Sequence, residues 1–172
     1  FHEVAHGLGI KETVNGLGSV DAALGNESSV WEEAKADILG LYMVCNLIDK
    51  GEIPLISKEA AITTYIASLV RSVRFGAAGA HGRANMMCYN FLKDNGAFER
   101  NKDGLYHINY DKVPEVVAAW AELIITTQAT GNYMFAKEYD TNHAVVPEAL
   151  SADIANVNRG GVPVDIRFEF VW

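Results

Sequence analysis

The sequence lacks the features that mark several large classes of protein. It has two cysteines in 172 residues, Cys45 and Cys88, which form no C-x-x-C pair and suggest no disulfide framework. No run approaches the ~18 consecutive apolar residues that a membrane-spanning helix needs, so we expect no membrane partner. Lys and Arg number 14 against 22 Asp and Glu, with no basic cluster, which disfavours nucleic-acid binding.

What remains is the composition of a soluble globular protein. Hydrophobic residues make up 49% and charged residues 21%, and the length suits one domain over residues 1–172. Both cysteines fall in apolar helical patterns, as buried thiols do, which is compatible with the cytoplasmic location that we expect. The sequence has no signal peptide and no initiator methionine. It begins one residue before a histidine whose helix needs an N-terminal turn, so we expect a fragment of a longer protein.

The most informative stretch is Phe1–Gly7, which contains His-Glu-x-x-His. Two histidines at i and i+4 project from one face of a helix, so the imidazoles of His2 and His6 can bind one ion. Glu3 lies beside them, where it can deprotonate a metal-bound water instead of binding the metal. The pattern predicts one zinc ion per chain.

A third ligand is expected in the segment Glu32-Glu33-Ala34-Lys35-Ala36-Asp37. Glu33 and Asp37 share a helix face, so one carboxylate can bind zinc while the other accepts the free ring N–H of a ligand histidine. Ser29-Val30-Trp31-Glu32 matches a capping box, which would place Glu32 at the helix start. On that ground Glu33 is favoured as the ligand, and Glu32 stays open as the alternative.

These two motifs together resemble peptidase family M49, the dipeptidyl peptidase III zinc metallopeptidases. The family usually carries H-E-x-x-x-H, and this chain is most similar to the subgroup with H-E-x-x-H, which in some proteins follows a nudix domain. The likeness continues through RSVRFG (71–76), AHG (80–82), KDNGAF (93–98) and GVPVDI (161–166). The resemblance implies a zinc-dependent exopeptidase that releases dipeptides from peptide N-termini.

The resemblance also implies roles for residues outside the two motifs. His81, in the A-H pair, would line the cleft and stabilise the oxyanion of the attacked peptide. Independently of the resemblance, Arg83 could bind a substrate carboxylate, although a solvated helix arginine is the favoured interpretation. The family places its cleft between two lobes, so we expect the second, N-terminal lobe to lie outside these residues. Without it, we expect the isolated chain to bind zinc but to show negligible activity.

The rest of the chain predicts one helix after another, and so a mainly α catalytic lobe with minor β structure. Apolar residues at steps of three and four, with glycine and proline breaks between them, predict helices over about 30–47, 58–75, 81–93, 114–130, 133–139 and 147–157. Residues 10–28 suggest a glycine-punctuated connection. Period-two alternation predicts one strand of a small hairpin near 105–110 and an extended segment over 164–170.

Two other functions remain open from the sequence. A thermolysin-like metalloendopeptidase also uses H-E-x-x-H with a downstream E-x-x-x-D, but its third ligand lies nearer the second histidine than Glu33 lies to His6. A non-catalytic zinc-stabilised domain attached to another enzyme, such as a nudix hydrolase, is the second alternative. The intact Glu3 argues against it, because a purely structural zinc site needs no general base.

Overall fold

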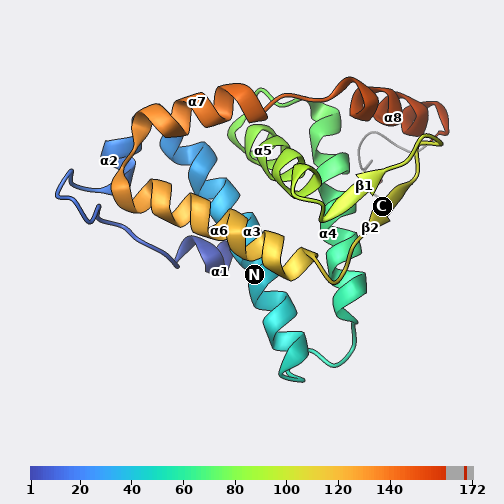
Figure 1. Ribbon diagram of the computed structural model, residues 1–172, viewed down its shortest axis with the longest axis horizontal. Helices are drawn as coiled ribbons and strands as arrows, with labels where there is room; N and C mark the ends of the chain where they lie inside the picture. The colour runs from blue at the N-terminus through green and yellow to red at the C-terminus, as the bar shows by residue number, and fades with distance from the viewer. Residues whose placement is uncertain (162–168, 170–172) are drawn as a thin grey trace.

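The fold is organised around one long helix, α3 (Ser28–Asp49), which lies near the middle of the computed structural model in Figure 1. The structure describes residues 1–161 and 169. The helices that pack most extensively on α3 are α1 (His2–His6), α4 (Lys58–Ser72), α5 (Ala80–Asp94) and α6 (Val113–Thr130). Because neighbours contact α3 on several sides, its first half is buried around much of its circumference. The mainly α prediction is confirmed.

Most of the predicted helices are present, with boundaries set by recognisable caps. The side chain of Ser57 accepts a hydrogen bond from the backbone N–H of Ala60 at the start of α4. Pro114 stands in the first turn of α6, and Gly131 ends it in the left-handed conformation. Helix α7 (Tyr133–His143) runs four residues further than the pattern predicted.

The segment 10–28 is more structured than the sequence suggested. It contains a short helix, α2 (Val20–Leu24), followed by a 3-10 turn, η1 (Gly25–Glu27), that leads into α3. The side chain of Ser19 caps α2 by accepting from the N–H of Ala22. A five-residue helix is too short to show a periodic pattern in the sequence. The prediction that residues 10–28 form a plain connection was therefore wrong at α2.

The minor β structure is one hairpin. Strand β1 (Phe98–Arg100) pairs antiparallel with β2 (Tyr106–Ile108), as the alternation near 105–110 predicted. Arg100 Nε donates to Asp153 Oδ2 at 2.6 Å, which ties the hairpin to α8 (Glu148–Arg159). A 3-10 turn, η2 (Val73–Phe75), extends α4. The extended segment predicted over 164–170 lies outside the described residues, apart from residue 169.

The core lies between α3, α5, α6 and α7. Trp31 from α3 and Trp120 from α6 are both fully buried, with ring centroids 6.3 Å apart, and Tyr139 from α7 packs against both. Trp31 Nε1 donates to the carbonyl of Ala136 at 3.3 Å, so the buried indole N–H is satisfied. This packing fixes the first half of α3, which carries the predicted ligand Glu33. Among the described helices, none is long and apolar enough to cross a membrane.

Candidate metal centre

The short helix α1 lies against α3 at a glycine. A Cβ built on Gly40 would come within 3.4 Å of the backbone nitrogen of His2, so a larger residue there would crowd α1. This close approach places both predicted histidines over the face of α3 that carries the acidic motif. The His2 and His6 rings meet edge to face with centroids 4.7 Å apart, and their Nε2 atoms are 3.1 Å apart.

Each histidine is held by a carboxylate of α3 on its other ring nitrogen. His2 Nδ1 lies 2.6 Å from Asp37 Oδ1, and His6 Nδ1 lies 3.2 Å from Glu32 Oε1. When the Nδ1–H of a neutral imidazole donates a hydrogen bond to a carboxylate, the lone pair that can bind a metal is on Nε2. The two carboxylates therefore select the tautomer in which both Nε2 atoms are acceptors, and those atoms face each other.

Glu33 adds a third acceptor to the same place. Its Oε2 lies 3.3 Å from His2 Nε2 and 3.0 Å from His81 Nε2. Although both distances are short enough for ion pairs, this buried oxygen has no hydrogen bond of acceptable geometry. The donor atoms of His2, Glu33 and His81 all lie within 4.8 Å of one another.

This arrangement fits a zinc ion. Ligands about 2.0–2.1 Å from a tetrahedral zinc lie about 3.3 Å from each other. The spacings from His2 Nε2 to His6 Nε2 and to Glu33 Oε2, 3.1 and 3.3 Å, are close to that value. Lone pairs that converge without a proton between them repel one another, and a divalent cation relieves that repulsion. The donor atoms that lie within 4.8 Å of one another belong to His2, Glu33 and His81, whereas the sequence motif assigns His2, His6 and Glu33 as the residues that would hold the ion.

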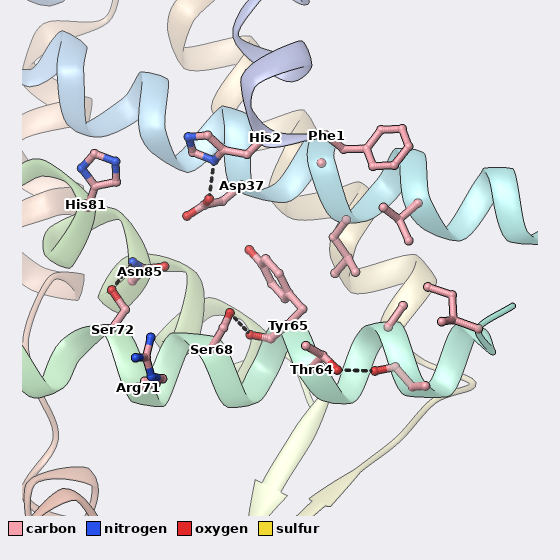
Figure 2. Close-up of a pocket in the computed structure, with 16 residues that line it drawn as sticks. Phe1, His2, Asp37, Thr64, Tyr65, Ser68, Arg71, Ser72, His81 and Asn85 are labelled. Carbon is pink, nitrogen blue, oxygen red and sulfur yellow. Dashed lines mark hydrogen bonds and ion pairs between the residues drawn. The ribbon is translucent and has the colours of Figure 1, made fainter. Parts of the chain in front are cut away.

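His81 projects toward this cluster from the first turn of α5, and its side chain is 69% exposed. Its ring stacks loosely against His2, with centroids 6.3 Å apart and planes 21° apart. Figure 2 shows His81 and His2 on the same rim of the cavity, with Asp37 below His2. Glu3, by contrast, is exposed, and within residues 1–161 no hydrogen bond or ion pair engages its carboxylate.

Burial and pairing shift the acidity of the two supporting carboxylates in opposite directions. Burial raises the pKa of Asp37, and the hydrogen bond from His2 only partly offsets it. Burial also acts to raise the pKa of Glu32, but hydrogen bonds from Lys35 and His6 outweigh it and lower the pKa. The hydrogen bonds from Lys35 and His6 therefore favour the charged form of Glu32.

Two sequence interpretations need correction. Ser29 and Glu32 do not form a capping box, because α3 begins at Ser28 and Glu32 lies beyond its first turn. Glu32 faces His6 because successive helix residues differ by about 100° in direction, which turns Glu33 toward His2 and His81. The orientation of Glu33 toward His2 and His81 therefore follows from helix geometry and not from a cap at Glu32.

Arg83 is not a solvated helix arginine. Its guanidinium donates to Asp140 Oδ1 and to Glu27 Oε2, each at 3.0 Å, and both carboxylates are buried. Because those contacts engage it, we do not propose it as a substrate-binding group. Its pairing fixes the first turn of α5, two residues beyond His81.

Sequence reasoning missed two residues at the centre. Lys35 is buried and pairs with Glu32 at 2.7 Å, and its place one turn after Glu32 in the acidic motif was a visible signal. Gln128 Nε2 donates to Glu32 Oε2 at 3.2 Å from α6. Nothing local marks Gln128, because it lies 96 positions away and only tertiary packing brings it there.

A cavity of about 720 Å³ adjoins the cluster between α3, α4 and α5. Figure 2 shows His2, Asp37 and His81 at one edge and Tyr65, Ser68 and Arg71 from α4 across from them. Apolar side chains form much of its wall: Leu41, Val44, Ile56, Ala60 and Ala61. The site therefore combines converging metal donors with an adjacent, largely apolar space.

Comparison with known proteins places this geometry in context. No protein-family model matches the chain. The chain is similar to "Nudix hydrolase 3" of Arabidopsis thaliana, with 31% identity over 98% of this chain and 22% of that protein. Among solved structures, it is similar to dipeptidyl-peptidase III from Caldithrix abyssi (TM-score 0.89, 34% identity, 96% of this chain, 32% of that one).

A second solved structure agrees with the first. Dipeptidyl-peptidase III from Corallococcus sp. strain EGB matches with a TM-score of 0.87 and 35% identity, over 96% of this chain and 31% of that one. The chain thus spans about a fifth of the curated relative and about a third of the two peptidase structures. Nearly all of this chain has the fold of a helical part of dipeptidyl-peptidase III.

Proposed function

We propose that this chain is the zinc-binding helical lobe of an M49, dipeptidyl-peptidase III-like metallopeptidase that releases N-terminal dipeptides. The observation that carries the proposal is that His6 Nε2 and Glu33 Oε2 lie 3.1 and 3.3 Å from His2 Nε2, with each histidine held by its own carboxylate. The likeness to two dipeptidyl-peptidase III structures supports the same reaction class. It also disfavours the thermolysin-like alternative.

Each residue of the site has a part in this reaction. Zinc, when bound, supplies a Lewis acid that polarises the peptide carbonyl and makes water a better nucleophile. Glu3 accepts a proton from the attacking water and passes it to the leaving amine. His81 donates a hydrogen bond to the oxygen of the attacked carbonyl. Asp37 and Glu32 hold the two ligand histidines in the required tautomer.

The substrate in this proposal is a peptide that lies beside the cluster. The adjacent cavity offers apolar surface next to His2 and His81, where a substrate residue can be desolvated. The groups that grip the substrate N-terminus belong, in this proposal, to a second lobe, because this chain spans only about a third of the peptidase structures. Positioning of the substrate by that lobe can lower the activation barrier by roughly 7–11 kcal/mol.

Elemental analysis after exhaustive dialysis tests the proposal. We expect about one zinc per chain, as a site with two His and one Glu requires, and loss of the metal in the His2→Ala/His6→Ala variant. A fluorogenic dipeptide-amide assay should show negligible turnover for this chain and clear turnover for a longer protein that contains it with the second lobe. Absence of zinc, or equal zinc in the double variant, would overturn the assignment. Comparable turnover by this chain alone would remove the two-lobe part of it.

The likeness to a protein named nudix hydrolase supports a second candidate function, that of a non-catalytic zinc domain attached to another enzyme. Glu3→Gln separates the two. In the peptidase proposal this variant keeps zinc and loses hydrolysis in the longer protein. If peptide hydrolysis is absent from the longer wild-type protein at full zinc occupancy, the non-catalytic function is favoured.

A further inference from the structure

Lys35 is a fully buried cation beside the metal cluster. Its side chain is 0% exposed, and its ammonium has three acceptors within reach. These are Glu32 Oε1 at 2.7 Å, the carbonyl of Leu8 at 2.7 Å and the carbonyl of His6 at 3.4 Å. Three acceptors match the three N–H donors of an ammonium group, so the charge is buried with a full set of partners.

All three acceptors belong to the surroundings of one predicted zinc ligand. His6 is the last residue of α1, and Leu8 lies in the turn that follows it. A helix of five residues is not stable by itself, so contacts from elsewhere must fix the direction of its last turn. Lys35 supplies such contacts, because it binds the carbonyl of His6 and that of Leu8 from the neighbouring helix α3.

The third acceptor connects Lys35 to the His6 ring. Glu32 Oε1 receives both the Lys35 ammonium at 2.7 Å and His6 Nδ1 at 3.2 Å. The lysine therefore holds His6 twice, through its backbone carbonyl and through the carboxylate that accepts from its ring. Lys11 also reaches the His6 carbonyl, at 2.7 Å, but its side chain is largely exposed and its ammonium lies 3.9 Å from Glu32.

The loop after α1 is shaped to lie against the lysine. Gly9 has φ of +81°, and a Cβ on it would come within 3.2 Å of Lys35 Cδ. Glycine tolerates that backbone conformation and leaves room for the lysine side chain. The loop therefore lies directly over Lys35, and a side chain at position 9 would press on it.

We propose that Lys35 is a positioning residue of the metal centre, which sets the orientation of His6 and so the affinity for zinc. The proposal rests on the proposed function, because it requires His6 to be a ligand. It assigns to Lys35 no contact with metal or substrate. Its effect passes through Glu32 and through the last turn of α1.

Zinc affinity measured by chelator competition tests this proposal on the 172-residue chain. We expect Lys35→Met to weaken zinc binding about 10–100-fold, as loss of a group that orients a ligand does. Lys58→Met is the matched control, because it removes an ammonium from an exposed ion pair with Asp49 and should leave the affinity unchanged. Visible absorption of Co²⁺ bound in place of zinc reports ligand geometry and should change in Lys35→Met only.

A double-mutant cycle distinguishes positioning from a general loss of stability. If Lys35 acts through Glu32, the double variant Lys35→Met/Glu32→Gln loses less zinc affinity than the product of the fold-losses of the two single variants. The proposal is wrong if the wild type binds zinc and the zinc affinity of Lys35→Met is within about twofold of it. It is also wrong if the fold-losses of the two single variants simply multiply in the double variant. If the wild type binds no zinc, the proposed function falls first and this proposal with it.

Two glycine variants give an answer if Lys35→Met does not fold. Gly9→Ala presses on the lysine side chain and should weaken zinc binding by about threefold or more, in the same sense as other disturbances around a ligand. Gly16→Ala is its control, because Gly16 has a similar φ of +78° but nothing within 4 Å of an added Cβ. Equal zinc affinities for the two variants would overturn the proposal.

Discussion

Replacing Arg83 with methionine should destabilise the fold strongly, because it leaves two buried carboxylates without a counter-ion. Glu27 and Asp140 are 4% and 6% exposed. Arg83 donates from Nε to Asp140 Oδ1 and from Nη2 to Glu27 Oε2, each at 3.0 Å, and a further short contact joins Nη2 to Asp140. The cluster ties the first turn of α5 to η1 and α7.

The expected size of the effect follows from the burial of the partners. Removing one member of a buried ion pair costs about 3–5 kcal/mol, since the other charge is left desolvated. The Arg83 side chain is itself 29% exposed, so water can partly replace it, and we expect the lower end of that range, about 3 kcal/mol. The same change should also loosen the start of α5, which carries His81.

Urea unfolding followed by circular dichroism measures the effect. Lys58→Met is the control, because its pair with Asp49 is exposed and such pairs contribute about 0–1 kcal/mol. Adding Glu27→Gln and Asp140→Asn to Arg83→Met should recover much of the lost stability, because neutral amides need no counter-ion. A loss below about 1 kcal/mol for Arg83→Met would refute the reasoning that these carboxylates depend on Arg83.

Three further outcomes can be measured. Glu33→Ala should lose zinc while Glu3→Gln retains it, and equal zinc content in the two variants would contradict the assigned roles. Burial raises the pKa of Cys88 to about 12, so a thiol reagent should label it only after unfolding. The hydrogen bond from Arg100 lowers the pKa of Asp153, so its stabilisation is present above about pH 3.9 and is lost below the lower folded-state pKa. The difference in unfolding free energy between wild type and Asp153→Asn, measured against pH, should shrink in that acidic range.

The sequence alone determined the features that depend on neighbours along the chain. His2 and His6 share a face because i and i+4 always do in a helix, whatever surrounds it. The apolar periodicity of α3, α4 and α6 likewise marked these helices, since each must bury one side. Local spacing therefore predicted the mainly α fold and proposed His2 and His6 as ligands, with the third ligand in the Glu32-Glu33 pair.

Tertiary structure decided which partner each of these side chains meets. Glu32 and Glu33 are adjacent in sequence, and only the rotation of α3 against α1 turns Glu32 to His6 and Glu33 to His2. Arg83 looked like a surface residue because its partners, Glu27 and Asp140, lie 56 and 57 positions away. The burial of Lys35 could not be predicted for the same reason. Its ammonium is paired with Glu32 and with the carbonyls of His6 and Leu8, and those two carbonyls reach it only after α1 has packed on α3.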